Sequence, residues 1–432
     1  MIGGAIKPAA DGASAELGYA SIPKHRYTSP EFAAREWSEM WSRVWLMAGL
    51  VRDIPERGDY FTFEIGPESL LVVRQPDGSI GARYNVCMHR GNRLRDPGRG
   101  HADSFSCTFH GWRYGIDGTL IAAQDPGSFP QGVPCERFSL KEVRCETWAG
   151  MVWVCLDADA PPLREFLGVM PEHLDPYHFE EMALANDVTV EVECNWKTSL
   201  DAFNESYHIA ATHPWTLEFT DDVACTIDLW DQHTRMVLPL AVASPRHAGH
   251  GTVTPLIKEY FIGGAGLDPA EFRGTADDVR PAIAKAIREV QGPSVGADFS
   301  ELSDEQLLDD FHYTVFPNLT FNIHARFAWL FRHRPHPDDP NRMFFDFFNL
   351  VRTPAIEVPR PAHESHRLAD GYSFADCLPG GELFDEDMHN LPRVQAGMRS
   401  RAFESLHLGD QEARIRHFHR TLDGYLDAGG LR

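Results

Sequence analysis

Two cysteines and two histidines occur as matched pairs in one stretch of the chain. Cys87 and His89 form a C-x-H pair, and after seventeen further residues Cys107 and His110 form a C-x-x-H pair. Four such ligands can hold a Zn²⁺ ion tetrahedrally. They can also hold a [2Fe–2S] cluster, with both thiolates on one iron and both imidazoles on the other. Zinc sites usually pair like ligands, whereas each half here is mixed, so the spacing favours the cluster.

The two imidazoles determine what such a cluster does. Replacing two thiolates by neutral imidazoles removes negative charge and raises the reduction potential. A coordinating imidazole also keeps one ring N–H that can donate to an acceptor, which couples the cluster to another centre. We therefore predict a Rieske [2Fe–2S] cluster with a role in electron transfer.

A second pair of histidines lies in the segment 195–214. His208 and His213 are five residues apart, and on an unbroken helix their side chains would diverge by about 140°. They can share a metal only if the helix bends or ends near them, and Pro214 favours an end there. Two imidazoles and one carboxylate, with open positions for O₂, form the facial site of non-haem Fe(II) oxygenases. Downstream of a cluster motif, this pair predicts a mononuclear iron site.

The source of the carboxylate is open from the residues alone. Asp201 and Glu205 precede His208 by about two turns and one turn, and a Glu-x-x-His pair faces one way on a helix. The other source is the acidic run 385–387 near the C-terminal end. Acids at a helix start are also stabilised there by the helix dipole, without any metal.

The elements that position these residues predict an α+β protein in three parts. Residues 1–47 form an arm and an amphipathic helix that packs on the catalytic domain. Residues 48–160 hold short β-type runs broken by turn residues, typical of a small antiparallel β domain. Residues 161–432 mix strands with helices, the clearest of which are expected at 200–211, 386–398 and 411–428.

Composition limits the class of protein. The chain of 432 residues has 40 Lys and Arg against 63 Asp and Glu, a formal charge of −23. This disfavours nucleic acid or an anionic membrane as the main partner. No apolar stretch approaches the length of a membrane span and the N-terminus lacks a signal-peptide pattern, so we expect a cytoplasmic protein. Six of the eight cysteines have no partner at ligand spacing and are expected to be buried thiols.

Taken together, the motifs resemble those of the large (α) subunit of Rieske non-haem iron oxygenases, the ring-hydroxylating oxygenase family. The resemblance covers most of the chain. It implies an antiparallel β Rieske domain, then a catalytic domain with a large antiparallel sheet covered by helices, of the helix-grip type. It assigns the [2Fe–2S] cluster to the two mixed pairs, which are Cys87, His89, Cys107 and His110.

The same resemblance implies the iron ligands. The family's (D/E)-x-Y-H-x₄-H motif corresponds here to His208 and His213. Its third ligand is an Asp eight residues before a Gln, which implies Asp387, eight before Gln395, with Asp385 as the fallback.

An acidic residue in the family links a cluster histidine of one subunit to an iron histidine of the next. It is usually Asp, two residues before the motif tyrosine, a position held here by Glu205. Where the family commonly has a Glu-Asn pair before an aromatic residue, this chain has Asp201 followed by Ala202. The bridge is therefore expected to be Glu205, Asp201 or both.

In function, the resemblance implies a terminal oxygenase. A reductase, alone or through a ferredoxin, would supply electrons from NAD(P)H, and His110 and the bridge would pass them to the iron. O₂ is the co-substrate. The expected assembly is a head-to-tail homotrimer, possibly with small β subunits. Two other classes stay open, a Rieske electron carrier without catalysis and a zinc-stabilised binding protein, although the long segment after residue 160 exceeds what a carrier needs.

The substrate is expected to be an aromatic or polycyclic compound that is mono- or cis-dihydroxylated. This expectation rests on apolar residues with an occasional amide along the predicted iron helix, namely Leu200, Phe203, Asn204 and Ile209, and on facing strands in 311–348. The alternatives are demethylation, a quaternary amine or an aromatic acid. An aromatic cage near the iron would favour the amine, and a buried Arg would favour the acid.

Overall fold

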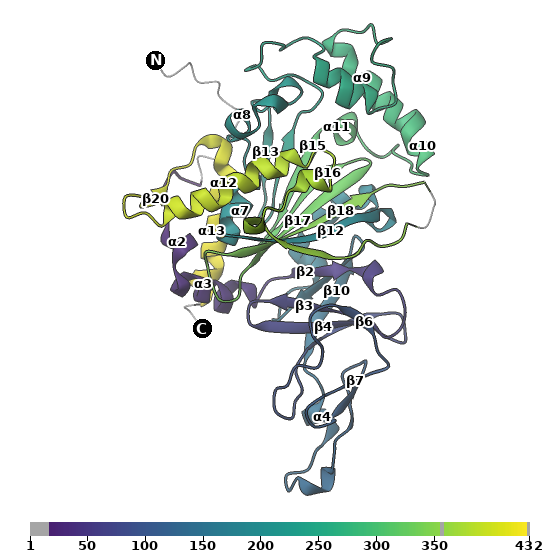
Figure 1. Ribbon diagram of the computed structural model, residues 1–432, viewed down its shortest axis with the longest axis vertical. Helices are drawn as coiled ribbons and strands as arrows, with labels where there is room; N and C mark the ends of the chain where they lie inside the picture. Colours follow the sequence, from purple (N-terminus) through teal and green to yellow (C-terminus); the bar gives the residue numbers. More distant parts are fainter. Residues whose placement is uncertain (1–16, 355–357, 430–432) are drawn as a thin grey trace. The chain divides into compact units, whose positions relative to one another are not determined.

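A computed structural model describes residues 17–354 and 358–429 (Figure 1). The chain divides into two compact units. The smaller unit spans Trp37–Asp175, and the larger unit combines the chain up to Glu36 with the chain from Pro176 onward. The domain boundaries predicted after residues 47 and 160 stay predictions. The first 16 residues of the predicted arm lie outside the described residues.

An antiparallel sheet of seven strands forms the body of the smaller unit. Strand β3 buries Phe61, Phe63 and Ile65 on alternate positions, as expected for a sheet with one core face. A separate sheet of three short strands follows in the sequence. The predicted antiparallel β domain is confirmed. The larger sheet has the order β2 (Leu46–Leu50), β11 (Met151–Cys155), β10 (Glu142–Trp148), β5 (Ile80–Tyr84), β4 (Glu68–Arg74), β3 (Asp59–Ile65) and β6 (Arg99–His101), and the small sheet has β7 (Ser104–Ser106), β8 (Arg113–Gly115) and β9 (Leu120–Ala122).

The larger unit contains an eight-stranded sheet whose neighbours are antiparallel with one exception. The predicted large antiparallel sheet is present, with one parallel pair at its edge, where β19 pairs with β12. Strands β18 and β19 flank β12 on its two sides and run in opposite directions, so the one is antiparallel to β12 and the other parallel. The order is β13 (Thr226–Leu229), β14 (Thr234–Leu238), β15 (Asp310–Val315), β16 (Leu319–His324), β17 (Phe327–Pro335), β18 (Met343–Val351), β12 (Ala183–Val192) and β19 (Glu364–Arg367).

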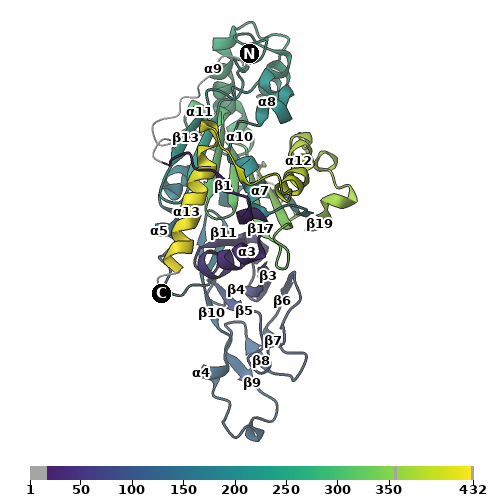
Figure 2. The ribbon, with the colours of Figure 1, turned by 90° about the vertical axis from the view of Figure 1, so that its left-hand side faces the viewer.

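Three helices matter most for the site. Helix α7 (Trp196–Phe203) packs on β17 and β18, and α12 (Glu382–Met398) contacts α7 and β12. Helix α13 (Ala413–Gly429) contacts β13 (Figure 2). The side-chain amide of Gln395 joins α12 to α7. Its Oε1 accepts from the backbone N–H of Asn195 and from the hydroxyl of Thr198, both at 3.0 Å.

The prediction of one continuous helix over 200–211 is wrong. Helix α7 ends at Phe203, and a single-turn helix α8 (Ile209–Thr212) follows after a gap. Side chains in the gap bond to other groups than the helical backbone: Asn204 accepts from the hydroxyl of Thr314, and Glu205 accepts from the backbone N–H of His208. The first bond is tertiary and the second is local, and a local side-chain bond to the backbone competes with helix continuation.

The cysteines are all free thiols. Of the six expected to be buried, Cys155, Cys194 and Cys225 are buried, Cys145 and Cys377 are half-buried, and Cys135 is exposed. The expectation is therefore wrong for Cys135. Within the described residues, no helix is long and apolar enough to span a membrane.

A buried ion pair in the larger unit gives a first prediction. Nζ of Lys197 lies 2.6 Å from Oε1 of Glu36, and the side chains are 0% and 2% exposed. Burial lowers the pKa of Lys197 and raises the pKa of Glu36. Replacing Lys197 by Met is expected to lower the free energy of unfolding by about 3–5 kcal/mol, because it leaves Glu36 buried without its partner.

The control is the double variant Lys197→Met with Glu36→Leu, measured by urea unfolding. An apolar pair of similar volume is expected to restore most of the loss, because both desolvated charges are gone. A double variant as unstable as the single one would contradict this account.

Candidate metal centres

Two ligand loops in the smaller unit, residues 87–92 and 107–112, share one backbone design. In each loop a glycine N–H donates to the carbonyl of the cysteine, Gly91 to Cys87 at 2.9 Å and Gly111 to Cys107 at 3.0 Å. The glycine φ angles are 76° and 69°, in the left-handed region that L side chains rarely adopt. Each cysteine N–H in turn donates to the carbonyl five residues ahead. The loops therefore present one thiol and one imidazole each in matching frames.

The four side chains of these loops fit a cluster. Cys87 and Cys107 are 1% and 3% exposed, and the rings of His89 and His110 lie with their centroids 4.6 Å apart. His89 stacks on Trp112 at 4.9 Å with an interplanar angle of 7°. Its Nδ1 is buried without a hydrogen-bond partner among the described residues. A buried ring nitrogen with a free lone pair suits a metal ligand and otherwise costs free energy.

Hydrogen bonds reach both sulfur atoms. The Tyr114 hydroxyl lies 3.3 Å from Sγ of Cys87, and the amide of Asn92 donates to Sγ of Cys107 over 3.7 Å. Donors to the sulfurs stabilise the thiolate and help to set the potential of an iron–sulfur cluster. Burial raises the pKa of Cys87. For Cys107, burial also acts to raise the pKa, but hydrogen bonds from the backbone N–H groups of residues 110 and 109 and from the side chains of Cys87 and Asn92 together lower it.

The second centre brings His208, His213 and Asp387 together in the larger unit. One ligand atom from each lies within 4.8 Å of the others. Oδ1 of Asp387 is 3.0 Å from Nε2 of His213 and 3.6 Å from Nε2 of His208. The two rings are 5.2 Å apart with an interplanar angle of 76°. Because α8 is a single turn between the histidines, both rings converge on one point, as a facial metal site requires.

Each of the two histidines is held by a carboxylate on its other ring nitrogen. Nδ1 of His208 lies 2.6 Å from Oε1 of Glu205, and Nδ1 of His213 lies 2.5 Å from Oε2 of Glu386. Glu386 also accepts from the indole N–H of Trp215 at 3.2 Å. These bonds place the proton on Nδ1 and leave the Nε2 lone pair for the metal.

The other acidic candidates lie elsewhere. Asp385 accepts from the backbone N–H of Phe374 at 2.7 Å and from the hydroxyl of Ser373 at 2.6 Å. Asp201 accepts from the Tyr27 hydroxyl at 2.6 Å, and burial raises its pKa to about 7. Neither carboxylate joins the histidine group. Glu386 belongs to the acidic run 385–387, but no spacing rule singles it out.

Glu386 gives a second prediction. Replacing it by Ala is expected to weaken Fe²⁺ binding about 10- to 100-fold, the usual loss when the hydrogen-bond partner of a metal-ligating histidine is removed. Competition with a chelator measures this without turnover. The matched control is Glu382→Ala on the same helix, which removes a carboxylate from the same cavity but no bond to a histidine. Equal Fe²⁺ affinities in the two variants would contradict the role of Glu386.

A cavity of about 1160 Å³, called the main cavity, adjoins the three metal-binding side chains. Phe203 and Ile209 line it, and so do residues of β15, β16, β17 and β18. Leu200 and Asn204 do not line it, and their place in a substrate pocket stays a prediction. Leu200 is fully buried, and Asn204 is held by Thr314. The break after α7 changes the face that the following residues present.

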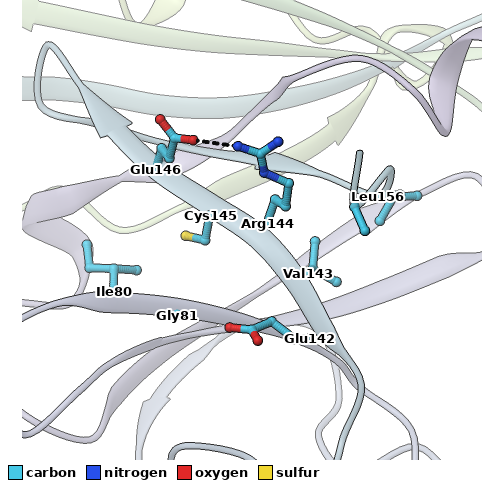
Figure 3. Close-up of a pocket in the computed structure, with 9 residues that line it drawn as sticks. Ile80, Gly81, Glu142, Val143, Arg144, Cys145, Glu146 and Leu156 are labelled. Atoms are coloured by element: carbon cyan, nitrogen blue, oxygen red, sulfur yellow. Dashed lines mark hydrogen bonds and ion pairs between the residues drawn. The ribbon is translucent and has the colours of Figure 1, made fainter. Parts of the chain in front are cut away.

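A smaller cavity of about 380 Å³ lies in the smaller unit, between β10 and its neighbours (Figure 3). Its charged side chains pair with one another or with nearby groups. Figure 3 shows Arg144 directed at Glu146, 3.1 Å away, and Glu142 pairs with Arg83 at 3.2 Å. The main cavity is therefore the better candidate for binding a substrate.

A β unit with two matched Cys/His loops, together with a helix-covered sheet that carries two histidines and one carboxylate, defines a protein with two kinds of iron centre. Comparison with known families gives the same result. Residues 44–136 match the Rieske [2Fe-2S] domain, and residues 179–428 match the ring hydroxylating alpha subunit (catalytic domain). The second match covers more than half of the chain. The chain belongs to the family of ring-hydroxylating alpha subunits, and it has a Rieske [2Fe–2S] domain and a mononuclear iron site.

Curated relatives fall into two substrate groups. The glycine betaine monooxygenase oxygenase subunit of Pseudomonas aeruginosa is 29% identical over 241 residues, which are 52% of this chain and 55% of that protein. The aligned part thus spans about half the length of that relative. The biphenyl 2,3-dioxygenase subunit alpha of Rhodococcus jostii is 27% identical over 387 residues, 86% of this chain and 77% of that protein.

Solved structures show the same fold at lower identity. A quaternary ammonium Rieske monooxygenase superposes with a TM-score of 0.69 at 18% identity, covering 98% of this chain and 100% of that one. Naphthalene 1,2-dioxygenase with indole bound superposes with a TM-score of 0.67 at 21% identity, covering 96% and 94%.

Proposed function

We propose that this chain is the terminal oxygenase of a multicomponent system that hydroxylates an organic substrate. The observation that carries the proposal is the group of His208, His213 and Asp387 at the wall of the main cavity. When bound, the Rieske cluster supplies single electrons and the mononuclear iron activates O₂. Three protein ligands leave coordination positions free for this purpose.

The chain's own residues orient the site. Glu205 and Glu386 hold the two histidines in the tautomer that ligates through Nε2. Apolar side chains such as Ile209, Met236 and Leu238 line the main cavity beside them. They bind the apolar body of a substrate and limit the access of water to the reacting carbon.

The partners follow from the same proposal. A reductase, directly or through a ferredoxin, feeds the electrons, and the protein works in the cytoplasm. We further propose a homotrimer in which Glu205 links the cluster of one subunit to the iron of the next, with or without β subunits. The short Glu205–His208 contact of 2.6 Å supports Glu205 over Asp201 for this role, because Asp201 bonds to Tyr27 instead.

A quaternary amine is the first candidate substrate. Aromatic rings cluster at the main cavity: Phe219 lies 5.6 Å from Trp215 and 6.0 Å from Tyr260 between ring centroids, both in edge-to-face geometry. A carboxylate outside the metal group, Glu382, also lines it. Aromatic faces and negative charge attract a cation. The glycine betaine monooxygenases among the relatives act on a substrate of this kind.

An aromatic compound is the second candidate. A cavity of about 1160 Å³ exceeds what a small amine fills and is slightly larger than the usual sites of drug-sized ligands, roughly 300–1,000 Å³. The relative that aligns over 86% of this chain is a biphenyl dioxygenase subunit.

The test is substrate-dependent O₂ uptake by the purified protein with a reductase, using glycine betaine and biphenyl as representatives of the two groups. Product analysis then distinguishes demethylation from ring hydroxylation. Coupled uptake with either compound supports the oxygenase. The absence of uptake with every member of both groups, in protein that holds both metal centres, would contradict the proposal.

A further inference from the structure

One wall of the main cavity is the face of the eight-stranded sheet, and strand register determines which side chains stand on it. His312 on β15 lies opposite Met236 on β14 and Asn322 on β16. Asp310, two residues earlier on β15, projects from the same face because side chains alternate along a strand. All four residues line the cavity. The sheet wall therefore carries polar groups among apolar ones.

His312 presents a fixed hydrogen-bond donor. His312 is only 2% exposed, and its Nδ1 lies 2.9 Å from Nη2 of Arg414. A guanidinium only donates, so Nδ1 accepts and the imidazole proton is on Nε2. That Nε2 atom is buried and finds no hydrogen-bond partner among the described residues. Burial and the charge of Arg414 lower the pKa of His312 well below its usual value, which keeps the ring neutral.

Arg414 is itself anchored to the sheet. The residue is fully buried on α13, where its Nε donates to the hydroxyl of Thr234 at 2.9 Å and its Nη2 to the hydroxyl of Thr314 at 2.6 Å. These bonds hold the guanidinium in place, so the tautomer of His312 is determined before any substrate binds.

Asp310 presents a fixed acceptor on the same face of β15. Its Oδ2 accepts from the amide of Asn322 at 2.7 Å, while its Oδ1 is buried without a hydrogen bond from any described residue. The nearest ring nitrogen, Nε2 of His324, is 3.7 Å away, which is too long for a hydrogen bond. Burial and Arg326 lower the pKa of His324 to about 4, so this ring is neutral and does not neutralise Asp310.

We propose that Nε2 of His312 and Oδ1 of Asp310 together bind one neutral group of the substrate that both accepts and donates a hydrogen bond, namely a hydroxyl or a primary amide. This inference rests on the proposed oxygenase function and names the substrate class within it. A carboxylate would meet the carboxylate of Asp310. A methyl or trimethylammonium group would leave both buried atoms unpaired, which costs free energy.

The test measures probe binding by calorimetry on the oxidised holoprotein, without a reductant, so that no turnover occurs. Two sets of probes differ in one group only: choline, propyltrimethylammonium and glycine betaine, and 2-naphthylmethanol, 2-ethylnaphthalene and 2-naphthoate. The pH is 8.0, because burial raises the pKa of Asp310 to about 7 and its carboxylate must be ionised. In the set that binds, the alcohol is expected to bind about tenfold more tightly than its methyl analogue.

The variant Asp310→Asn makes the test specific, since it replaces an acceptor by an N–H donor of the same size. The preference for the alcohol over the methyl analogue is expected to disappear, and the carboxylate probe is expected to become the tightest of its set. The matched control is Asp228→Asn on β13, which makes the same charge change at a carboxylate paired with Arg235 outside the main cavity. There the preference for the alcohol is expected to be unchanged.

The outcomes separate this inference from the proposed function. Binding of the methyl probes with no preference for the alcohol would overturn the inference alone. Failure of all six probes to bind would count against both. Should Asp310→Asn fail to fold, the comparison of alcohol and methyl probes on the unsubstituted protein decides the question by itself.

Discussion

Replacing His208 by Ala is expected to abolish turnover while the visible and EPR spectra of the Rieske cluster stay unchanged. His208 supplies one of three protein ligands to the mononuclear site, and the carboxylate of Asp387 lies 3.6 Å from its Nε2. Without it the metal loses its geometry, and we expect a loss of at least about 10³-fold in rate, or about 4 kcal/mol in the activation barrier. The cluster persists because its four ligands all belong to the smaller unit.

The matched control for this variant is His389→Ala. His389 lies on α12, two residues after Asp387, but its side chain is exposed. This variant is expected to retain its iron and its rate. Turnover that survived in His208→Ala would show that the iron is held elsewhere.

A large effect is also expected from Glu205→Gln, on the rate of electron transfer to the mononuclear iron. A glutamine can still accept from Nδ1 of His208, so both centres are expected to stay loaded. It lacks the negative charge that a bridge to a second imidazole uses, and a 10- to 100-fold slower single turnover is expected, as for other hydrogen-bond partners of metal ligands. Rapid mixing of reduced protein with O₂ and substrate measures this rate.

The conservative variant Glu205→Asp tests the same point from the other side. It places in this chain the residue that the family usually has, and it keeps the charge. It is expected to recover most of the rate that Glu205→Gln loses. Equal single-turnover rates in the unsubstituted protein and Glu205→Gln would rule out the bridge, whatever the iron content.

Sequence reasoning succeeded where ligands are close in the chain. Cys87 and His89 share one tight loop, and so do Cys107 and His110, so spacing alone identifies the cluster motif. The iron histidines required one further condition, a break in the helix. The structure meets it with the single turn of α8, although the break before His208 lies at 204–208 and not only at Pro214.

Reasoning from local pattern failed where the partner is distant. Glu386 bonds to a histidine 173 residues away, and no periodicity reveals such a pair. Asp387 was identified through the family resemblance and not through spacing to the histidines. A continuous helix through residue 211 is predicted from local pattern, whereas α7 ends at Phe203, where the side chain of Asn204 accepts from the distant Thr314. The parallel pairing of β19 is likewise a property of the whole chain path.

The central claim is that one chain holds a Rieske cluster and a separate mononuclear iron that work together. The most direct measurement is the iron and acid-labile sulfide content of anaerobically purified protein, compared with that of His208→Ala. The account predicts about three irons and two sulfides per chain, with one iron lost in the variant and the sulfide unchanged. Zinc without sulfide, or two irons in both proteins, would contradict it.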